Sequence, residues 1–158
     1  MMNQRTSAQF RATVMILTVA AIACAFVHSA MPAEVSSDES GGLVDILREI
    51  FDAVGIKCDP DEHIVRKAAH FTEYTVIGML LTSCAYSLDC FQCYRFTGYI
   101  LFAGLGTAFI DETIQLFSEG RAGLVADIWI DFSGIVFGTS VMLLFYFVYQ
   151  RNKRKRKR

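Results

Sequence analysis

Four long apolar segments constrain this 158-residue chain more than any other feature of its sequence. They are residues 12–30, 68–88, 96–117 and 124–149. An α-helix rises about 1.5 Å per residue, so each segment is long enough to cross the roughly 30 Å hydrocarbon core of a bilayer. Hydrophobic residues make up 53% of the chain and lie in long runs, which favours a membrane protein over a soluble one. The sequence therefore predicts an all-α, multi-pass protein of the cytoplasmic membrane with four transmembrane helices.

Residues 12–30 also fit a second interpretation, a cleaved signal peptide that follows the polar residues 1–11. A signal peptidase site needs small residues at fixed positions, and the end of this segment, Ala-Phe-Val-His-Ser-Ala, matches that pattern poorly. Cleavage would leave three spans with unchanged orientation. Both interpretations stay open from the sequence alone.

Charge is distributed unevenly along the chain, although the formal net charge is only −1. The basic tail, residues 150–158, holds seven Lys or Arg residues, and the positive-inside rule places it in the cytoplasm. Four spans then put both termini on that side. In this topology, fifteen of the sixteen acidic residues lie outside or at the outer membrane boundary, with Asp89 as the exception. A basic tail beside a membrane favours anionic lipid as a partner, and we do not expect nucleic acid.

Residues 31–66 are predicted to form an acidic loop outside the membrane. The early stretch Ser-Ser-Asp-Glu-Ser-Gly-Gly has the composition of a flexible linker. Residues 43–54 then place apolar side chains at every third or fourth position, which predicts a short amphipathic helix. Such a helix lies in the membrane interface or covers the bundle. Simple packing on its neighbours explains the pattern equally well.

Cys90 and Cys93 are the one pair among the five cysteines with motif spacing. Structural zinc needs four ligands, and no second pair follows, so this spacing does not predict a zinc site. We expect two reduced thiols in the tight turn formed by residues 89–95. The other three cysteines give no disulfide framework.

Three polar clusters are far apart in the sequence, yet the predicted topology brings all of them to the outer membrane boundary. Ionisable groups at membrane depth are costly, so their collection at one boundary indicates a functional pocket. Within each cluster, spacings of three or four residues place side chains on one helix face. The clusters are Lys67, His70, Glu73 and Tyr74 at the start of the second span, Asp111, Glu112 and Gln115 at the end of the third, and Arg121, Asp127 and Asp131 at the entry to the fourth.

The fourth span carries a further pattern below its two carboxylates. Asp127 and Asp131 are four residues apart, and the same stripe continues as Gly134 and Gly138. Small residues four apart allow two helices to approach closely. The stripe therefore predicts that these carboxylates point into the bundle.

A histidine among several carboxylates supports more than one kind of chemistry. Such a group can bind a divalent cation, share protons, or act as a general acid and base. Lys67 and Arg121 can hold a phosphate or carboxylate. The same charges can also do no more than pair with one another and join the helix ends. Because no HExxH or comparable ligand spacing is present, the sequence assigns no metal, cofactor or reaction.

Three sequence blocks lie between about residues 64 and 140. They are Lys67-x-x-His70-Phe-x-Glu73-Tyr74-x-x-x-Gly78, Asp111-Glu112-x-x-Gln115, and Gly120-Arg121 followed by Asp127, Asp131, Gly134 and Gly138. In order and spacing these blocks resemble the VanZ family of small bacterial membrane proteins. Two positions depart from the expected pattern, since Glu119 stands where proline is expected and Asp131 where asparagine is expected as often. The resemblance implies an association with teicoplanin resistance, by limiting how that lipid-tailed glycopeptide binds at the cell surface, but no established reaction.

We therefore expect an outward-facing pocket that binds or modifies a lipid-linked or cell-wall component, with membrane lipids, a lipid-linked precursor or a glycopeptide as partners. The residues expected to carry its chemistry, as catalytic or ligand-binding groups, are His70, Glu73, Asp111 and Asp127. Those expected to bind the substrate are Lys67, Tyr74, Glu112, Gln115, Arg121 and Asp131. Tyr74 follows Glu73 by one residue and is expected to bring its phenol to the rim of the pocket.

Two other functions compete with this expectation. A proton-coupled transporter or flippase would use the carboxylates as a relay. A structural or partner-binding membrane protein would use the charged cluster only to join helices. The sequence leaves open whether the protein is an enzyme and how many copies associate.

Overall fold

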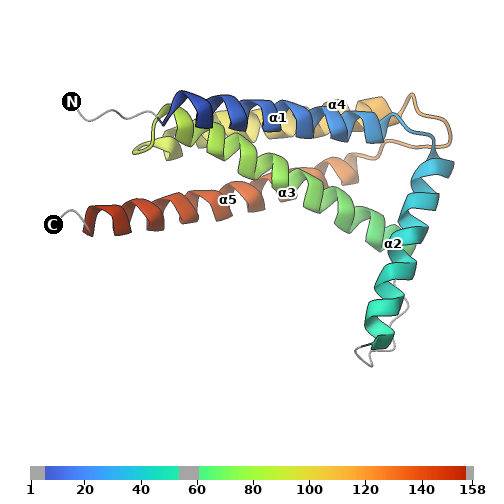
Figure 1. Ribbon diagram of the computed structural model, residues 1–158. Coiled ribbons are helices and arrows are strands. Elements are labelled where there is room, and N and C mark those ends of the chain that lie inside the picture. Colours follow the sequence, from blue (N-terminus) through green and yellow to red (C-terminus); the bar gives the residue numbers. More distant parts are fainter. Residues whose placement is uncertain (1–5, 54–60, 156–158) are drawn as a thin grey trace.

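The computed structural model describes residues 6–53 and 61–155, and these residues form helices and no strand (Figure 1). The all-α prediction is confirmed. The α-helices are α1 (Ala8–Ser29), α2 (Ala33–Ala53), α3 (Glu62–Leu88), α4 (Thr97–Gln115) and α5 (Val125–Lys155), and a 3₁₀-helix, η1 (Cys93–Phe96), precedes α4.

Two of the described helices, α1 and α5, are long and apolar enough to cross a membrane. The 22 residues of α1 rise about 33 Å, close to the thickness of the hydrocarbon core. α3 and α4 do not meet the same criterion, and each carries a polar cluster at one end. Large apolar side chains are exposed on several helices, among them Ile16 (67%), Phe102 (80%) and Phe147 (65%), as expected of surfaces covered by lipid. These features support a membrane protein, and the four-span arrangement remains a prediction.

α3 and α5 cross each other and form the most extensive helix contact of the molecule (Figure 1). A Cβ atom added to Gly134 would lie 2.5 Å from the carbonyl oxygen of Phe71 on α3. A Cβ on Gly78 would lie equally close, 2.5 Å, to the carbonyl oxygen of Ile135 on α5. Gly138 faces the backbone of α3 as well. The glycine stripe therefore allows the close helix contact that its spacing predicted.

α1 is part of the packed core and does not lie apart from the bundle. It packs against both α3 and α4. Ala25 is 1% exposed and joins Tyr74, Ile77, Ala108 and Ile135 in one apolar cluster. This cluster therefore joins α1, α3, α4 and α5, and it supports the functional groups at the bundle end.

α2 is longer than predicted, and the expected flexible linker is wrong. The helix begins at Ala33 instead of residue 43. Ser36, Ser40 and Val44 recur every fourth residue and are buried, and the helix packs against α3. The Ser40 hydroxyl donates to the Ser36 carbonyl, so the helix itself satisfies this hydroxyl. Tertiary packing thus overrides the turn-forming composition. The predicted end at residue 54 is outside the described residues.

The remaining helix ends differ modestly from the predicted bounds. α3 begins six residues earlier than expected because Asp61 caps it, with a side-chain oxygen that accepts from the His63 N–H at 2.7 Å. α5 continues through Lys155, so the described part of the basic tail extends this helix. In the turn after α3, the Asp89 side chain accepts hydrogen bonds from the Phe91 and Gln92 amides.

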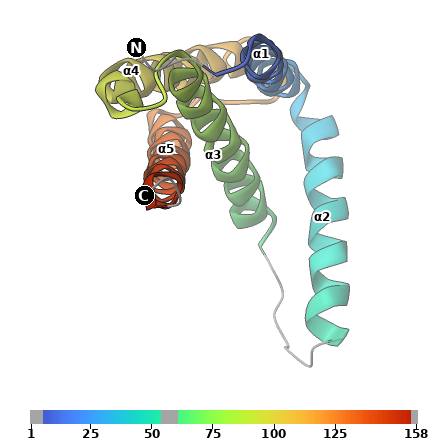
Figure 2. The same ribbon diagram turned by 60° about the vertical axis from the view of Figure 1, so that its left-hand side comes forward.

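The helix directions give the molecule two distinct ends. The start of α1 and the end of α5 lie at one end, and α2 lies at the other, roughly perpendicular to α1 (Figure 1). Figure 2 shows α2 beside the start of α3 and away from α5. The predicted polar clusters all lie at the end that carries α2.

Candidate functional site

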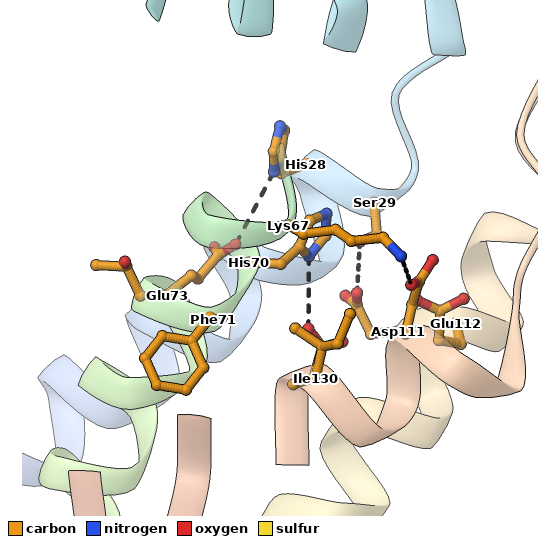
Figure 3. Close-up of polar contacts among 12 residues, drawn as sticks. His28, Ser29, Lys67, His70, Phe71, Glu73, Asp111, Glu112 and Ile130 are labelled. Carbon is orange, nitrogen blue, oxygen red and sulfur yellow. Dashed lines mark hydrogen bonds and ion pairs between the residues drawn. The ribbon is translucent and has the colours of Figure 1, made fainter. Parts of the chain in front are cut away.

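The polar ends of four helices meet near α2 (Figure 3). α3 and α5 are joined there by two contacts between a basic and an acidic side chain. Lys67 Nζ lies 3.3 Å from Asp127 Oδ1, and His70 Nδ1 lies 3.8 Å from Asp131 Oδ1. The second and fourth predicted spans, whose polar clusters the sequence placed at one membrane boundary, therefore bring these residues together as expected.

Asp111 is held from α1, a helix that the sequence did not connect with this residue. Its Oδ2 accepts a hydrogen bond from the Ser29 hydroxyl at 2.7 Å and one from Gln115 Nε2 at 3.3 Å. The Ser118 hydroxyl in turn donates to the Ser29 carbonyl at 2.9 Å. Asp111 is fully buried. The last turn of α1 therefore positions a carboxylate on α4.

Glu73 faces α1 and not the other carboxylates. Its Oε2 lies 3.9 Å from His28 Nδ1. The rings of His28 and His70 are stacked with their centroids 5.9 Å apart. The side chains of His28 and Glu73 remain about one quarter exposed, at 29% and 26%. The two stacked imidazoles connect the Glu73 side of the site with the Asp131 side.

Glu112 holds the turn that leads into α5. Its Oε2 accepts a hydrogen bond from the Leu124 N–H at 2.9 Å, and the side chain is buried. A Cβ on Gly123 would lie 2.5 Å from the Glu112 carbonyl oxygen, so this turn passes directly over the end of α4. Glu112 thus fixes where α5 starts, and its expected role in substrate binding stays a prediction.

Tyr74 does not lie at the pocket rim, and that expectation is wrong. The residue is 0% exposed and packs in the apolar core with Ala25 and Ala108. It follows His70 by four positions, so it lies on the same face of α3 as His70 but one turn deeper in the bundle. Its position makes it a floor beneath the site.

A pocket of about 170 Å³ opens at this end of the bundle. Carboxylate and cationic groups both line it, so it can receive an anionic group beside acidic side chains. The lining includes seven of the predicted site residues, Lys67, His70, Glu112, Gln115, Arg121, Asp127 and Asp131, and also His63 and Arg66. Three predicted residues, Glu73, Tyr74 and Asp111, lie beside or beneath it.

His63 and Arg66 are pocket residues that the sequence interpretation missed. His63 precedes Lys67 by four positions and Arg66 precedes His70 by four, so helical spacing alone would have placed all four on one face. Arg66 also donates to the Ser37 hydroxyl of α2 at 2.9 Å and pairs with Glu62. No spacing in the sequence pointed to Ser29, because its hydrogen bond to Asp111 depends on how α1 packs against α4.

The cysteine pair lies far from this site, in the turn between α3 and α4. Cys90 is half-buried and Cys93 is buried, and both thiols are unpaired, as predicted. Burial raises the pKa of each thiol above its ordinary value. The thiols therefore stay protonated at neutral pH, which does not favour a reactive or metal-binding role.

Comparison with known proteins identifies a family. The family model described as VanZ/LLP1 matches residues 14–147, a range that includes most of α1 and every residue of the site. No curated protein and no solved structure matches the chain.

Proposed function

The chain belongs to the VanZ/LLP1 family, and from this premise we propose that its pocket binds or modifies a lipid-linked component of the cell envelope at the outer leaflet. The resemblance to the VanZ family leads us to expect that this activity lowers the binding of teicoplanin at the cell surface. Whether the pocket transforms its ligand or only holds it, the same residues would contact the ligand headgroup.

The observation that carries this proposal is the charge pattern of the pocket. His63, Arg66, Lys67 and Arg121 supply cationic or protonatable groups to its lining. Lys and Arg bind phosphate and carboxylate groups, Arg in a bidentate manner. Lipid-linked envelope precursors and phospholipids carry such anionic groups next to their apolar chains. A pocket with these cations at the end of an apolar helix bundle suits a ligand that is anionic at one end and apolar at the other.

We further propose that α1, α3, α4 and α5 all cross the membrane, with the pocket at the outer boundary. The basic end of α5 and Arg11 lie at the opposite end of the bundle, which the positive-inside rule assigns to the cytoplasm. α2 runs roughly perpendicular to α1 and so would lie along the membrane surface (Figure 1). Its exposed apolar side chains Leu43, Ile46 and Ile50 suit an interfacial helix.

If modification occurs, His70 and Glu73 are the proton carriers that we propose. An imidazole and a carboxylate are the most common general acids and bases in proteins. His70 lines the pocket, and Glu73 connects to it through His28. Lys67 and Arg121 would hold the anionic group during such a step.

The proposed topology predicts the location of both chain ends. Green fluorescent protein fused to either terminus should fluoresce, and alkaline phosphatase fused to the C-terminus should be inactive, because the enzyme folds only outside the cytoplasm. Phosphatase inserted between Gly41 and Gly42, on a stretch of α2 where neither glycine has a close neighbour, should be active. An active C-terminal fusion would contradict the four-span arrangement.

The proposed function predicts glycopeptide selectivity. In a sensitive host, the protein should raise the inhibitory concentration of teicoplanin several-fold and leave that of vancomycin, which has no lipid tail, nearly unchanged. Susceptibility of cells with and without the protein measures this effect, and an immunoblot of the membrane fraction verifies its level. A well-expressed protein without any effect on teicoplanin would end the resistance interpretation and direct attention to other lipids of the outer leaflet.

A further inference from the structure

Three potential metal ligands converge where α3, α4 and α5 meet. One ligand atom from each of His70, Asp111 and Asp131 lies within 4.8 Å of those from the other two. Ligand atoms on opposite sides of a divalent ion are about 4–5 Å apart, because each bond is about 2.0–2.4 Å long. We propose that these three side chains bind one divalent cation at the floor of the pocket.

Asp131 lacks the partners that a buried carboxylate requires. The residue is 1% exposed, and neither of its side-chain oxygens has a hydrogen-bond partner among the described residues. His70, at 3.8 Å, is too distant for a hydrogen bond. A buried carboxylate without a partner is strongly destabilising, and a bound cation would remove this penalty. The other carboxylates that act on its charge are Asp111, Glu112, Asp127 and Glu73.

Asp111 is pre-oriented for ligation. Ser29 and Gln115 both donate to its Oδ2, which fixes the side chain. Its other oxygen, Oδ1, is buried and accepts no hydrogen bond within the part of the chain that the structure describes. Outer hydrogen bonds of this kind orient metal ligands in known sites.

Tyr74 provides an independent observation from beneath the site. It is 0% exposed, and its hydroxyl has no hydrogen-bond partner among the residues described. A buried phenol nearly always finds one. The charged groups that act most strongly on this hydroxyl are Asp111 and Asp131. The phenol can therefore donate to a ligating carboxylate once a cation has fixed that carboxylate in place.

The ligand set points to the class of ion. One imidazole and two carboxylates suit Mn²⁺ or Zn²⁺ better than the all-oxygen sites of Ca²⁺. His70 and Asp131 line the pocket, so the remaining coordination positions face its interior. An anionic oxygen of a ligand, held by Lys67 and Arg121, would occupy such a position. The metal site follows from this geometry alone and does not depend on the glycopeptide effect. With its imidazole bound to the cation, His70 could not carry a proton, so Glu73 would be the proton carrier of any acid–base step.

Binding of Mn²⁺ to the full-length protein tests the site directly. Protein purified in detergent and stripped with EDTA should take up one Mn²⁺ per chain, measured by loss of the free-ion signal in electron paramagnetic resonance. Asp131→Asn and His70→Gln should each weaken binding at least about tenfold, because each removes a ligand. Asp45→Asn, which changes an exposed carboxylate of α2 away from the pocket, should bind within about twofold of the wild type.

Thermal unfolding separates loss of the site from loss of the fold. Mn²⁺ should raise the Tm of the wild type and leave that of Asp131→Asn unchanged, because a ligand that binds only the folded state stabilises it. In EDTA, Asp131→Asn should melt at or above the wild-type temperature, since the substitution removes a buried carboxylate that has no hydrogen-bond partner among the described residues. The site is refuted if the wild type binds no Mn²⁺ at millimolar concentration, as expected if the two aspartates merely share a proton. It is also refuted if folded Asp131→Asn binds as tightly as the wild type.

The metal site and the proposed function can fail separately. If the protein binds Mn²⁺ but does not change teicoplanin susceptibility, the metal site stands and the proposed function is refuted.

Discussion

Replacing Gly138 with alanine should leave almost no folded protein. The added Cβ would collide with the Thr75 carbonyl group of α3 and would lie 3.1 Å from the Met79 nitrogen. Because these are backbone atoms, no side-chain rotation can relieve the contact, and the two helices must separate. Overpacking of a core usually costs 1–3 kcal/mol, and a backbone collision should reach about 3 kcal/mol or more, a large part of the stability of a small protein. Fluorescence-detected size-exclusion chromatography of a GFP fusion, combined with a melting curve, measures the loss.

Gly106 offers the matched control for this prediction. It is also a helical glycine, but a Cβ there would meet nothing within 4 Å. Alanine is a better helix former than glycine by about 1 kcal/mol, so Gly106→Ala should fold as well as the wild type or slightly better. If Gly138→Ala behaved like Gly106→Ala, the close crossing of α3 and α5 would be wrong. Since this crossing also sets the distance between His70 and Asp131, the site would have to be reconsidered with it.

Substitutions that neutralise a carboxylate in or next to the pocket should abolish the teicoplanin effect while the protein still accumulates in the membrane. We expect Glu73→Gln, Asp111→Asn and Asp127→Asn each to return the teicoplanin inhibitory concentration to that of cells without the protein. Each substitution keeps the size of the side chain and removes its negative charge. Asp127→Asn breaks an ion pair with Lys67 that is only partly buried, which should cost about 1 kcal/mol or less and leave membrane levels normal. Susceptibility assays paired with immunoblots of the membrane fraction measure both quantities.

Asp45→Asn is the control for these variants. Asp45 forms an ion pair with Arg48 at 2.9 Å, which is shorter than the 3.3 Å pair of Asp127 with Lys67. The Asp45 pair lies on α2 away from the pocket, and the Asp45 side chain is 73% exposed. This variant should retain the full teicoplanin effect. Pocket variants that disappear from the membrane would show that the charged cluster mainly joins helices. Pocket variants that accumulate and still protect against teicoplanin would show that the pocket is not where the protein acts.

Part of the site could be predicted because helical periodicity fixes which residues share a face. Spacings of three and four placed Lys67 with His70, and Asp127 with Asp131, and the structure pairs these residues across α3 and α5. Charges are costly in apolar surroundings, so their presence in apolar helices already indicated a common location. The same rule would have added His63 and Arg66, whose spacing was not used.

The errors share a different cause, since each concerns a residue whose environment is set by another helix. Tyr74 was expected at the rim, but α1 and α4 bury it with Ala25 and Ala108. Residues 36–42 have a turn-forming composition, yet they are helical because small side chains of α2 pack against α3. Local propensity is weak compared with such contacts.

The sequence by itself determined the helical class, the apolar segments and the concentration of charge at one end, because these depend on composition and on spacing along one chain. Only the tertiary structure decided that Ser29 of α1 holds Asp111 of α4, and that Asp131 is buried close to His70 and Asp111. Hydrogen bonds and metal coordination depend on atoms a few ångströms apart, and the crossing of α3 and α5 brings such atoms together from distant parts of the chain. The candidate cation site follows from those distances, which no single helix contains.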